Sequence, residues 1–201
     1  MGQTLVFSKY VSEGGEDMVQ SLVVTVSVVV FILGTGGLAH AVKCGGENAS
    51  IVGTSGDDTL TGSSEKDVIH GKGGDDTING NGGGDIICGG GGSDTIIAGG
   101  EDKSRIWGGS GGDTIIGSEG PDDISGQAGP DIINGNGGDD DIDGGSGDDT
   151  IMGESGDDLL DGGDNDDRIV GGPGTDRCEV DPSPSALPLE ECEQDLDGTP
   201  L

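Results

Sequence analysis

Aspartates recur at one position of a nine-residue repeat through most of this 201-residue chain. Carboxylate oxygens are hard ligands of the kind that Ca²⁺ prefers, and the ion takes about six to eight of them. Aspartates delivered at a fixed interval therefore predict a row of calcium sites. The aspartates expected to bind metal are Asp58, Asp67, Asp76, Asp85, Asp94, Asp113, Asp122, Asp131, Asp140, Asp149, Asp158, Asp167 and Asp176.

The repeat that carries these aspartates runs for fourteen units, from Gly53 to Glu179. Units such as GTSGDDTLT and GKGGDDTIN have Gly first, Gly usually fourth, Asp sixth and Leu or Ile eighth. Ser104 replaces the aspartate in one unit, and Ala98 is inserted between the fifth and sixth units. A fixed period of this kind predicts a solenoid in which each repeat buries its apolar face against its neighbours.

Each position of the repeat has a physical interpretation. Glycines at the first and fourth positions indicate a tight turn with positive φ and close backbone approach. The last three residues alternate and favour a strand, which would be three residues long, with the eighth residue pointing inward. Two units would then form one coil, so the sequence predicts an all-β parallel β-roll of seven coils around a thin double row of Ile and Leu.

Units two apart would stack on the same side of such a roll. An ion between consecutive loops would receive an aspartate carboxylate and backbone carbonyls from each loop. Ser104 removes a carboxylate from two of these gaps, which leaves about ten sites with both carboxylates. Mg²⁺ fits less well because it demands strict octahedral geometry, and no His or Cys recurs to indicate Zn²⁺.

This pattern, G-G-x-G-x-D-x-U-x, resembles the RTX or hemolysin-type calcium-binding nonapeptide over residues 53–179. The resemblance implies a parallel β-roll in a secreted bacterial protein, with Ca²⁺ driving the folding of an otherwise disordered segment. Two features depart from the family pattern, the Ala98 insertion and the unit GGEDKSRIW. They put the calcium sites of the fifth and sixth units in doubt and predict a kink.

Composition supports a fold that depends on metal. The chain has a net charge of −32, 46 glycines, 29% hydrophobic residues and 2% aromatic residues. Low apolar content with high net charge is typical of disorder, because too little apolar surface is buried to offset the conformational entropy. The same negative charge excludes nucleic acid and anionic lipid as partners.

The first 41 residues are of a different kind. An apolar run over 22–33, followed by Ala39-His40-Ala41, predicts a signal peptide cleaved after Ala41 and hence a secreted, extracellular protein. Acidic residues before the run suggest Met18 as the true start. The alternative is a membrane anchor over 22–38, at the short limit of about 17–25 residues for a spanning helix.

The four cysteines and the ends of the repeat array belong together. An even cysteine count in an exported chain suggests disulfides. Four cysteines allow three connectivities, of which Cys44–Cys88 and Cys178–Cys192 are favoured because they would staple both ends of the roll. Residues 42–52 are expected to cap the N-terminal end as a degenerate half-unit with Ile51 at the eighth position. Residues 180–201 are expected to form a C-terminal cap and an acidic tail.

No H-E-x-x-H zinc motif occurs in the sequence. His40 lies in the predicted signal peptide and His70 at an outward ninth position, so neither indicates catalysis. The sequence predicts a calcium-binding extracellular protein, monomeric, with no enzymatic activity and no small-molecule substrate, that folds on binding calcium after export. The alternative is a cell-surface adhesin or matrix spacer built on the same roll. An ice-binding solenoid is less favoured, because only Thr59 and Thr61 form an outward Thr-x-Thr pair.

Overall fold

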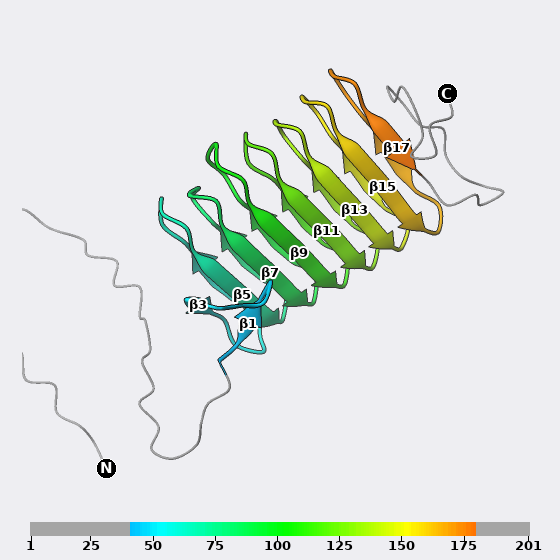
Figure 1. Cartoon of the computed structure of the whole chain (residues 1–201). Coiled ribbons are helices and arrows are strands. Elements are labelled where there is room, and N and C mark those ends of the chain that lie inside the picture. The colour runs from blue at the N-terminus through cyan, green and yellow to red at the C-terminus, as the bar shows by residue number, and fades with distance from the viewer. Residues whose placement is uncertain (1–40, 180–201) are drawn as a thin grey trace, which may run out of the picture. The chain divides into compact units, whose positions relative to one another are not determined.

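The computed structural model of the chain describes residues 41–179, all of whose regular elements are β-strands. Fifteen of the seventeen strands form two parallel sheets that face each other along a solenoid of stacked coils (Figure 1). The parallel β-roll of seven coils that the repeat predicts is thereby confirmed.

The larger sheet has eight strands in the order β17-β15-β13-β11-β9-β7-β5-β3. Most of them begin at the seventh position of an even-numbered unit and continue into the next unit. Their bounds are Ile51–Val52 (β3), Val68–Gly73 (β5), Ile86–Gly91 (β7), Arg105–Ser110 (β9), Asp123–Ala128 (β11), Asp141–Ser146 (β13), Leu159–Asp164 (β15) and Arg177–Glu179 (β17).

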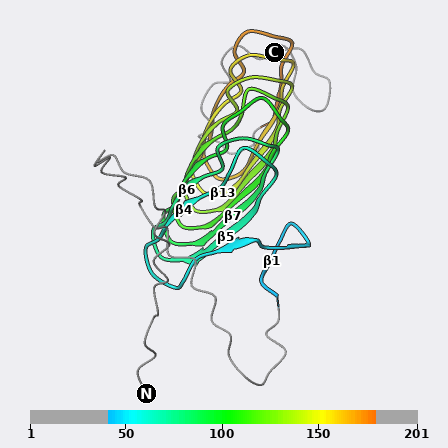
Figure 2. The same cartoon turned by 90° about the vertical axis from the view of Figure 1, so that its left-hand side faces the viewer.

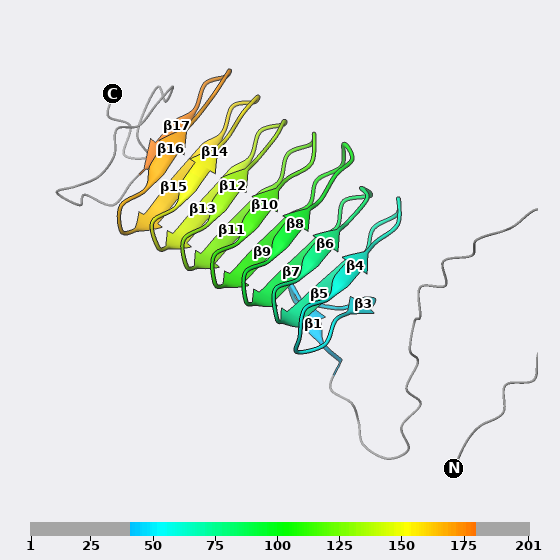
Figure 3. The same ribbon diagram turned by 180° about the vertical axis from the view of Figure 1, so that it is seen from behind.

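The smaller sheet has seven strands in the order β16-β14-β12-β10-β8-β6-β4, which are labelled in Figure 3, where the molecule is turned by 180° from Figure 1. Each of its strands is the last three residues of an odd-numbered unit. Their bounds are Thr59–Thr61 (β4), Thr77–Asn79 (β6), Thr95–Ile97 (β8), Thr114–Ile116 (β10), Ile132–Asn134 (β12), Thr150–Met152 (β14) and Arg168–Val170 (β16).

One coil contains two repeat units, as predicted. Ile133 of β12 lies opposite Ile151 of β14, and Ile124 of β11 lies opposite Ile142 of β13, so the register advances by eighteen residues. The chain alternates between the two sheets, and along its axis the roll is a flattened oval (Figure 2).

The prediction of three-residue strands is right for the smaller sheet and wrong for the larger one. Six of the larger sheet's strands are six residues long, because their hydrogen-bond ladder continues through the first three positions of the following unit. At the end of these strands the Gly74 N–H still donates to the Gly91 carbonyl, and the Gly92 N–H to the Ser110 carbonyl, both at 2.8 Å.

The core is the double row of eighth-position side chains that the repeat predicts. These side chains are at most 3% exposed from the second unit onward and form one continuous cluster. Fully burying an aliphatic side chain of this size stabilises a fold by about 1.5–3 kcal/mol. The buried aliphatic set is Ile69, Ile78, Ile87, Ile96, Ile106, Ile115, Ile124, Ile133, Ile142, Ile151, Leu160 and Ile169.

The Ala98 insertion is absorbed within the roll. Its side chain is buried in the core, and the register across it becomes nineteen residues, with Thr95 opposite Thr114. Gly99 and Gly100, both with positive φ, take up the extra residue. The Ala98 N–H donates to the Ile116 carbonyl at 2.9 Å, so the sheet pairing that a kink would interrupt continues through the insertion.

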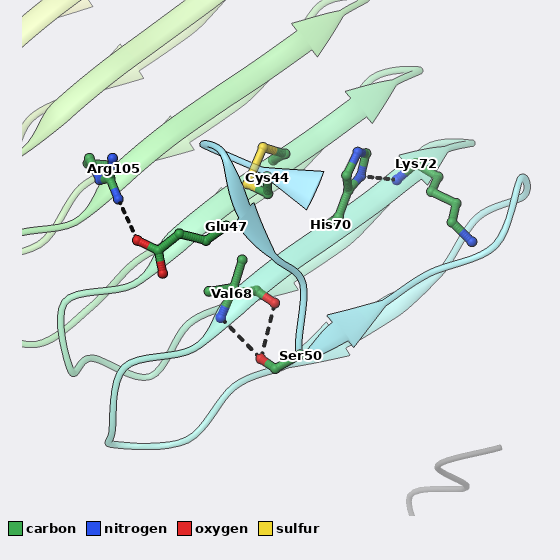
Figure 4. Close-up of a disulfide and its surroundings, with 8 residues drawn as sticks. Cys44, Glu47, Ser50, Val68, His70, Lys72 and Arg105 are labelled. Atoms are coloured by element: carbon green, nitrogen blue, oxygen red, sulfur yellow. Dashed lines mark hydrogen bonds and ion pairs between the residues drawn. A yellow bond between two sulfur atoms is a disulfide. The ribbon is translucent and has the colours of Figure 1, made fainter. Parts of the chain in front are cut away.

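A small antiparallel hairpin, β1 (Lys43–Cys44) and β2 (Glu47–Asn48), lies across the outer face of the larger sheet rather than over its end. The predicted Cys44–Cys88 disulfide is confirmed and ties the hairpin to β7 (Figure 4). Under the hairpin, Val68 and Ile86 form a second, smaller core with Cys44. These two seventh-position side chains are therefore exceptions to the outward orientation predicted for that position.

Ionic contacts and strand pairing also hold this end of the chain in place. Glu47 of the hairpin pairs with Lys66 at 3.2 Å and with Arg105 at 3.1 Å. Ile51 lies opposite Ile69, which is the eighth-position register expected of it. Within 41–179 no helix is long and apolar enough to cross a membrane. The signal or anchor segment and Cys192 lie outside the described residues, so those predictions remain open.

Candidate metal centre

The sixth-position aspartates form two rows along the roll, as the two-unit coil requires. Each residue stands directly before a strand, so strand pairing carries every aspartate onto the one from the next coil. One row holds Asp58, Asp76, Asp94, Asp113, Asp131, Asp149 and Asp167. The other row holds Asp67, Asp85, Ser104, Asp122, Asp140, Asp158 and Asp176.

These carboxylates are buried to an unusual degree. Eleven of the thirteen are at most 2% exposed, and only Asp58 and Asp67 of the first coil are half-buried. Aspartate is rarely buried completely unless its charge is paired. The salt bridges Lys66–Glu47, Lys103–Asp123 and Arg105–Glu47 do not involve a sixth-position aspartate.

From the second coil onward, the Oδ1 atom of every sixth-position carboxylate has a partner within the roll. It accepts the backbone N–H of the sixth-position residue one coil earlier, as in Asp122 N–H to Asp140 at 2.8 Å and Asp140 N–H to Asp158 at 2.9 Å. The same bond recurs along both rows at 2.7–3.0 Å. This ladder fixes the orientation of the carboxylate in the turn.

The Oδ2 atom has no such partner in most units. In ten aspartates it is buried and accepts no hydrogen bond. Leaving a buried acceptor unsatisfied costs about 1–3 kcal/mol, and more for a charged group. The ten are Asp76, Asp85, Asp94, Asp113, Asp131, Asp140, Asp149, Asp158, Asp167 and Asp176.

The electrostatic consequence is visible in the pKa values. Burial, opposed by the backbone hydrogen bond and reinforced by the neighbouring carboxylates, raises the pKa of Asp140 to about 8. The same causes raise the pKa of Asp131 to about 7. A stack of carboxylates whose charged form is disfavoured by desolvation and mutual repulsion is a site that a cation would stabilise.

Backbone oxygens lie close to the unsatisfied carboxylate oxygens. A Cβ placed on Gly71 would collide with Oδ2 of Asp76 and come within 2.5 Å of the Gly89 carbonyl oxygen, one coil further on. The same arrangement recurs at Gly135, beside Asp140 and the Gly153 carbonyl. The first-position glycine is therefore needed for close approach, as predicted.

The sequence predicts positive φ at the first and fourth positions; it is found at the fourth in most units, for example at Gly138, and at the second, for example at Asn136, rather than at the first. At the first position only Gly99, next to the insertion, has a φ in that region. The turn therefore reverses around the second and fourth residues. This orientation is what brings the first glycine's Cα against the carboxylate.

Carboxylates alone do not build a metal cage here. Among residues 41–179, no group of three or more His, Cys, Asp or Glu side chains gathers in a way that could hold an ion. A cation between two loops would have to take backbone carbonyl oxygens as well as carboxylates, a donor set that suits Ca²⁺.

The two features that departed from the family pattern have different outcomes. Asp94 of the fifth unit keeps the common arrangement: its N–H donates to Oδ1 of Asp113 at 2.8 Å and its own Oδ2 is unsatisfied. In the sixth unit Ser104 accepts the Asp85 N–H through its hydroxyl at 3.3 Å and brings no carboxylate.

His70 accepts the Lys72 N–H at 3.0 Å through Nδ1, which gives that ninth-position side chain a structural contact.

Comparison with known proteins agrees with this geometry. The RTX calcium-binding nonapeptide repeat family, whose profile spans four copies of the repeat, matches residues 45–71, 61–96, 89–124, 116–151 and 143–178. No curated protein matches the chain significantly. The matched family is a structural calcium-binding repeat and not a known enzyme family. Because these matches span well over half of the sequence, the chain belongs to the RTX calcium-binding nonapeptide repeat family.

Proposed function

We propose that this protein is an extracellular calcium-binding protein whose roll is completed by Ca²⁺ ions held between successive turns. The observation that carries the proposal is the set of ten buried aspartate oxygens without a hydrogen-bond donor, aligned in two rows. An ion between two turns would supply the positive charge that these oxygens lack.

The ligands would be the sixth-position aspartates together with turn carbonyls from two successive coils. Six gaps in the row from Asp58 to Asp167 have a carboxylate on both sides, and four gaps do so in the row from Asp67 to Asp176. The number of these gaps, ten, equals the number of unsatisfied aspartate oxygens, which supports one ion in each gap. All thirteen aspartates would then contribute to at least one site.

Folding would depend on these ions. The chain has a net charge of −32, and its core is only a thin double row of side chains. Without metal the carboxylates therefore repel one another strongly, and little apolar surface is buried to offset this repulsion. Because ligands from two coils meet only in the folded roll, the free energy of ion binding becomes free energy of folding.

Export is supported by the disulfide of the roll and by the calcium affinity typical of extracellular modules. The Cys44–Cys88 disulfide is typical of proteins that mature in an oxidising compartment. Extracellular calcium modules bind with dissociation constants of about 10⁻⁴–10⁻³ M, so a chain of this kind would remain unfolded at low calcium and fold once outside the cell. We propose no enzymatic activity, no nucleic-acid or small-molecule partner, and a monomeric state.

A pair of substitutions tests the proposed sites. Asp140→Asn removes a buried carboxylate charge, whereas Asp139→Asn removes the charge of the exposed neighbouring side chain. We expect native mass spectrometry to count about ten Ca²⁺ ions on the wild type and on Asp139→Asn, and one or two fewer on Asp140→Asn. Mg²⁺ at the same concentration should leave the sites unfilled. Equal ion counts for the two variants, or a wild type that binds no calcium, would overturn the proposal.

A further inference from the structure

Three sixth-position aspartates differ from the other ten. Asp58, Asp67 and Asp122 have an Oδ2 atom that accepts a hydrogen bond from within its own turn. The donor in each case is the backbone N–H of the second residue of the same unit: Thr54 at 2.6 Å, Ser63 at 2.7 Å and Ser118 at 2.5 Å.

The hydroxyl group of that second residue completes the arrangement. Thr54 Oγ1 and Ser63 Oγ each lie 2.9 Å from the same carboxylate oxygen, and Ser118 Oγ lies 2.9 Å from Oδ1 of Asp122. Ser118 is completely buried, and its Oγ also accepts the Gly120 N–H at 3.1 Å. The hydroxyl therefore joins the carboxylate to the turn backbone without a cation.

Backbone conformation separates the same two classes. In the three hydroxyl-bearing units, the second residue is not among those with positive φ. In all the other units it has positive φ, whether it is glycine or a residue such as Asn81, Asn136 or Glu154. Positive φ turns the N–H away from the carboxylate: that of Asn81 donates to its neighbour Asn79 at 3.0 Å instead. Thr54 is β-branched and strongly disfavoured in this region. In the Ser63 and Ser118 units, the bonds from the serine N–H and hydroxyl to the carboxylate favour the other conformation.

The hydroxyl units occur where the preceding turn supplies no aspartate. Asp58 belongs to the first turn of its row, and Asp67 is preceded by the half-unit, where Ser50 lies 3.3 Å from its Oδ1. Asp122 is preceded by Ser104, whose N–H donates to its Oδ1 at 2.7 Å. The three turns that could not share an ion with an earlier carboxylate are thus the three that satisfy their own Oδ2.

We infer that a serine or threonine at the second position closes a turn without an ion on its N-terminal side, so that Thr54, Ser63 and Ser118 determine which gaps of the roll are left free of calcium. The inference rests on the proposed function, since it specifies which of the stacked turns take an ion. It divides the row that contains Ser104 into two separate ion arrays, whereas the row from Asp58 to Asp167 remains continuous.

The interrupted row allows a test by gain of ions. Ser104→Asp restores the missing carboxylate, and its own unit already has positive φ at Gly100. We expect this variant to gain one Ca²⁺, in the gap with Asp85. Adding Ser118→Gly removes the hydroxyl and permits positive φ, so the double variant should gain a second ion, in the gap with Asp122. Native mass spectrometry counts these ions individually.

A test by loss of ions uses Glu154, which lies at the second position of the Asp158 unit with φ of 70°. Glu154→Ser should lose one ion, whereas Glu154→Asn removes the same charge but tolerates positive φ and should keep the full number. Far-UV circular dichroism in calcium confirms that each variant is folded.

Two results would overturn the inference while leaving the proposed function intact. In the first, the wild type binds about ten ions and Ser104→Asp gains two ions without Ser118→Gly. In the second, Glu154→Ser and Glu154→Asn bind equal numbers of ions. A wild type without bound calcium would instead refute the proposed function itself.

Discussion

At the scale of single residues, each sixth-position aspartate has two different oxygens. In ten of the thirteen, Oδ1 accepts a backbone N–H from the previous coil and so fixes the carboxylate in the turn, while the buried Oδ2 accepts no hydrogen bond. Burial of such a group is tolerated only when a counter-charge is present. Under the proposed function, the residue would therefore contribute to stability in the presence of calcium and oppose folding in its absence.

The raised pKa values give this opposition a pH dependence. In the metal-free roll the pKa of Asp140 is about 8 and that of Asp131 about 7, against 3.8 for an unburied aspartate. At pH values between the unfolded pKa and the raised folded pKa, the folded form binds more protons than the unfolded form, so the stability of the metal-free roll falls as the pH rises. We expect calcium-free protein to gain β-structure by circular dichroism when the pH is lowered from about 8 to about 5. Loss of structure over that range would contradict the assignment.

At the scale of the strands, burial alternates from residue to residue. Ile133 of β12 is completely buried in the core, whereas its neighbour Ile132 is 50% exposed. Truncating a buried isoleucine to alanine costs about 2–5 kcal/mol, because transfer and cavity terms add. Ile133→Ala should therefore lower the melting temperature in saturating calcium, and Ile132→Ala should leave it nearly unchanged. Similar losses for both variants would show that β12 does not have this inward face.

The N-terminal hairpin is expected to stabilise only its local region. It covers Trp107, whose ring atoms would lie 2.8 Å from a Cβ added at Gly45, and the Cys44–Cys88 disulfide holds it there. Replacing both cysteines by serine should expose the indole, shift its fluorescence to longer wavelength and leave the circular dichroism of the calcium-loaded roll unchanged. Collapse of the β-signal would instead make the hairpin part of the roll's folding unit.

How far the sequence predicts this structure differs between features. The period and the eighth-position core follow from residue spacing, because a solenoid converts a repeat directly into a stack. The Cys44–Cys88 pair belongs to one of three possible connectivities, which is favoured because it would staple an end of the roll. The six-residue strands of the larger sheet did not follow, since the glycine-rich first three positions do not have the β-branched or alternating pattern of a strand and so conceal a continuing hydrogen-bond ladder. The nonapeptide pattern also does not predict the contacts of Ser118, although a serine whose hydroxyl bonds to the carbonyl two residues later is a known turn signal.

At the scale of the whole molecule, the chain has the composition of a disordered protein and the repeat of a solenoid. Under the proposed function each description applies in one condition. The rows of buried carboxylates would drive the coils apart when no cation is present, and bound calcium would hold the coils together. The roll and its ions are then a single cooperative unit, which is the central claim of this account.

A titration of the purified chain with Ca²⁺ at neutral pH, followed by far-UV circular dichroism, tests that claim most directly. We predict a random-coil spectrum in chelator and a cooperative transition to β-structure at about 10⁻⁴–10⁻³ M calcium, which Mg²⁺ does not reproduce. A fully formed β-spectrum in chelator would contradict it.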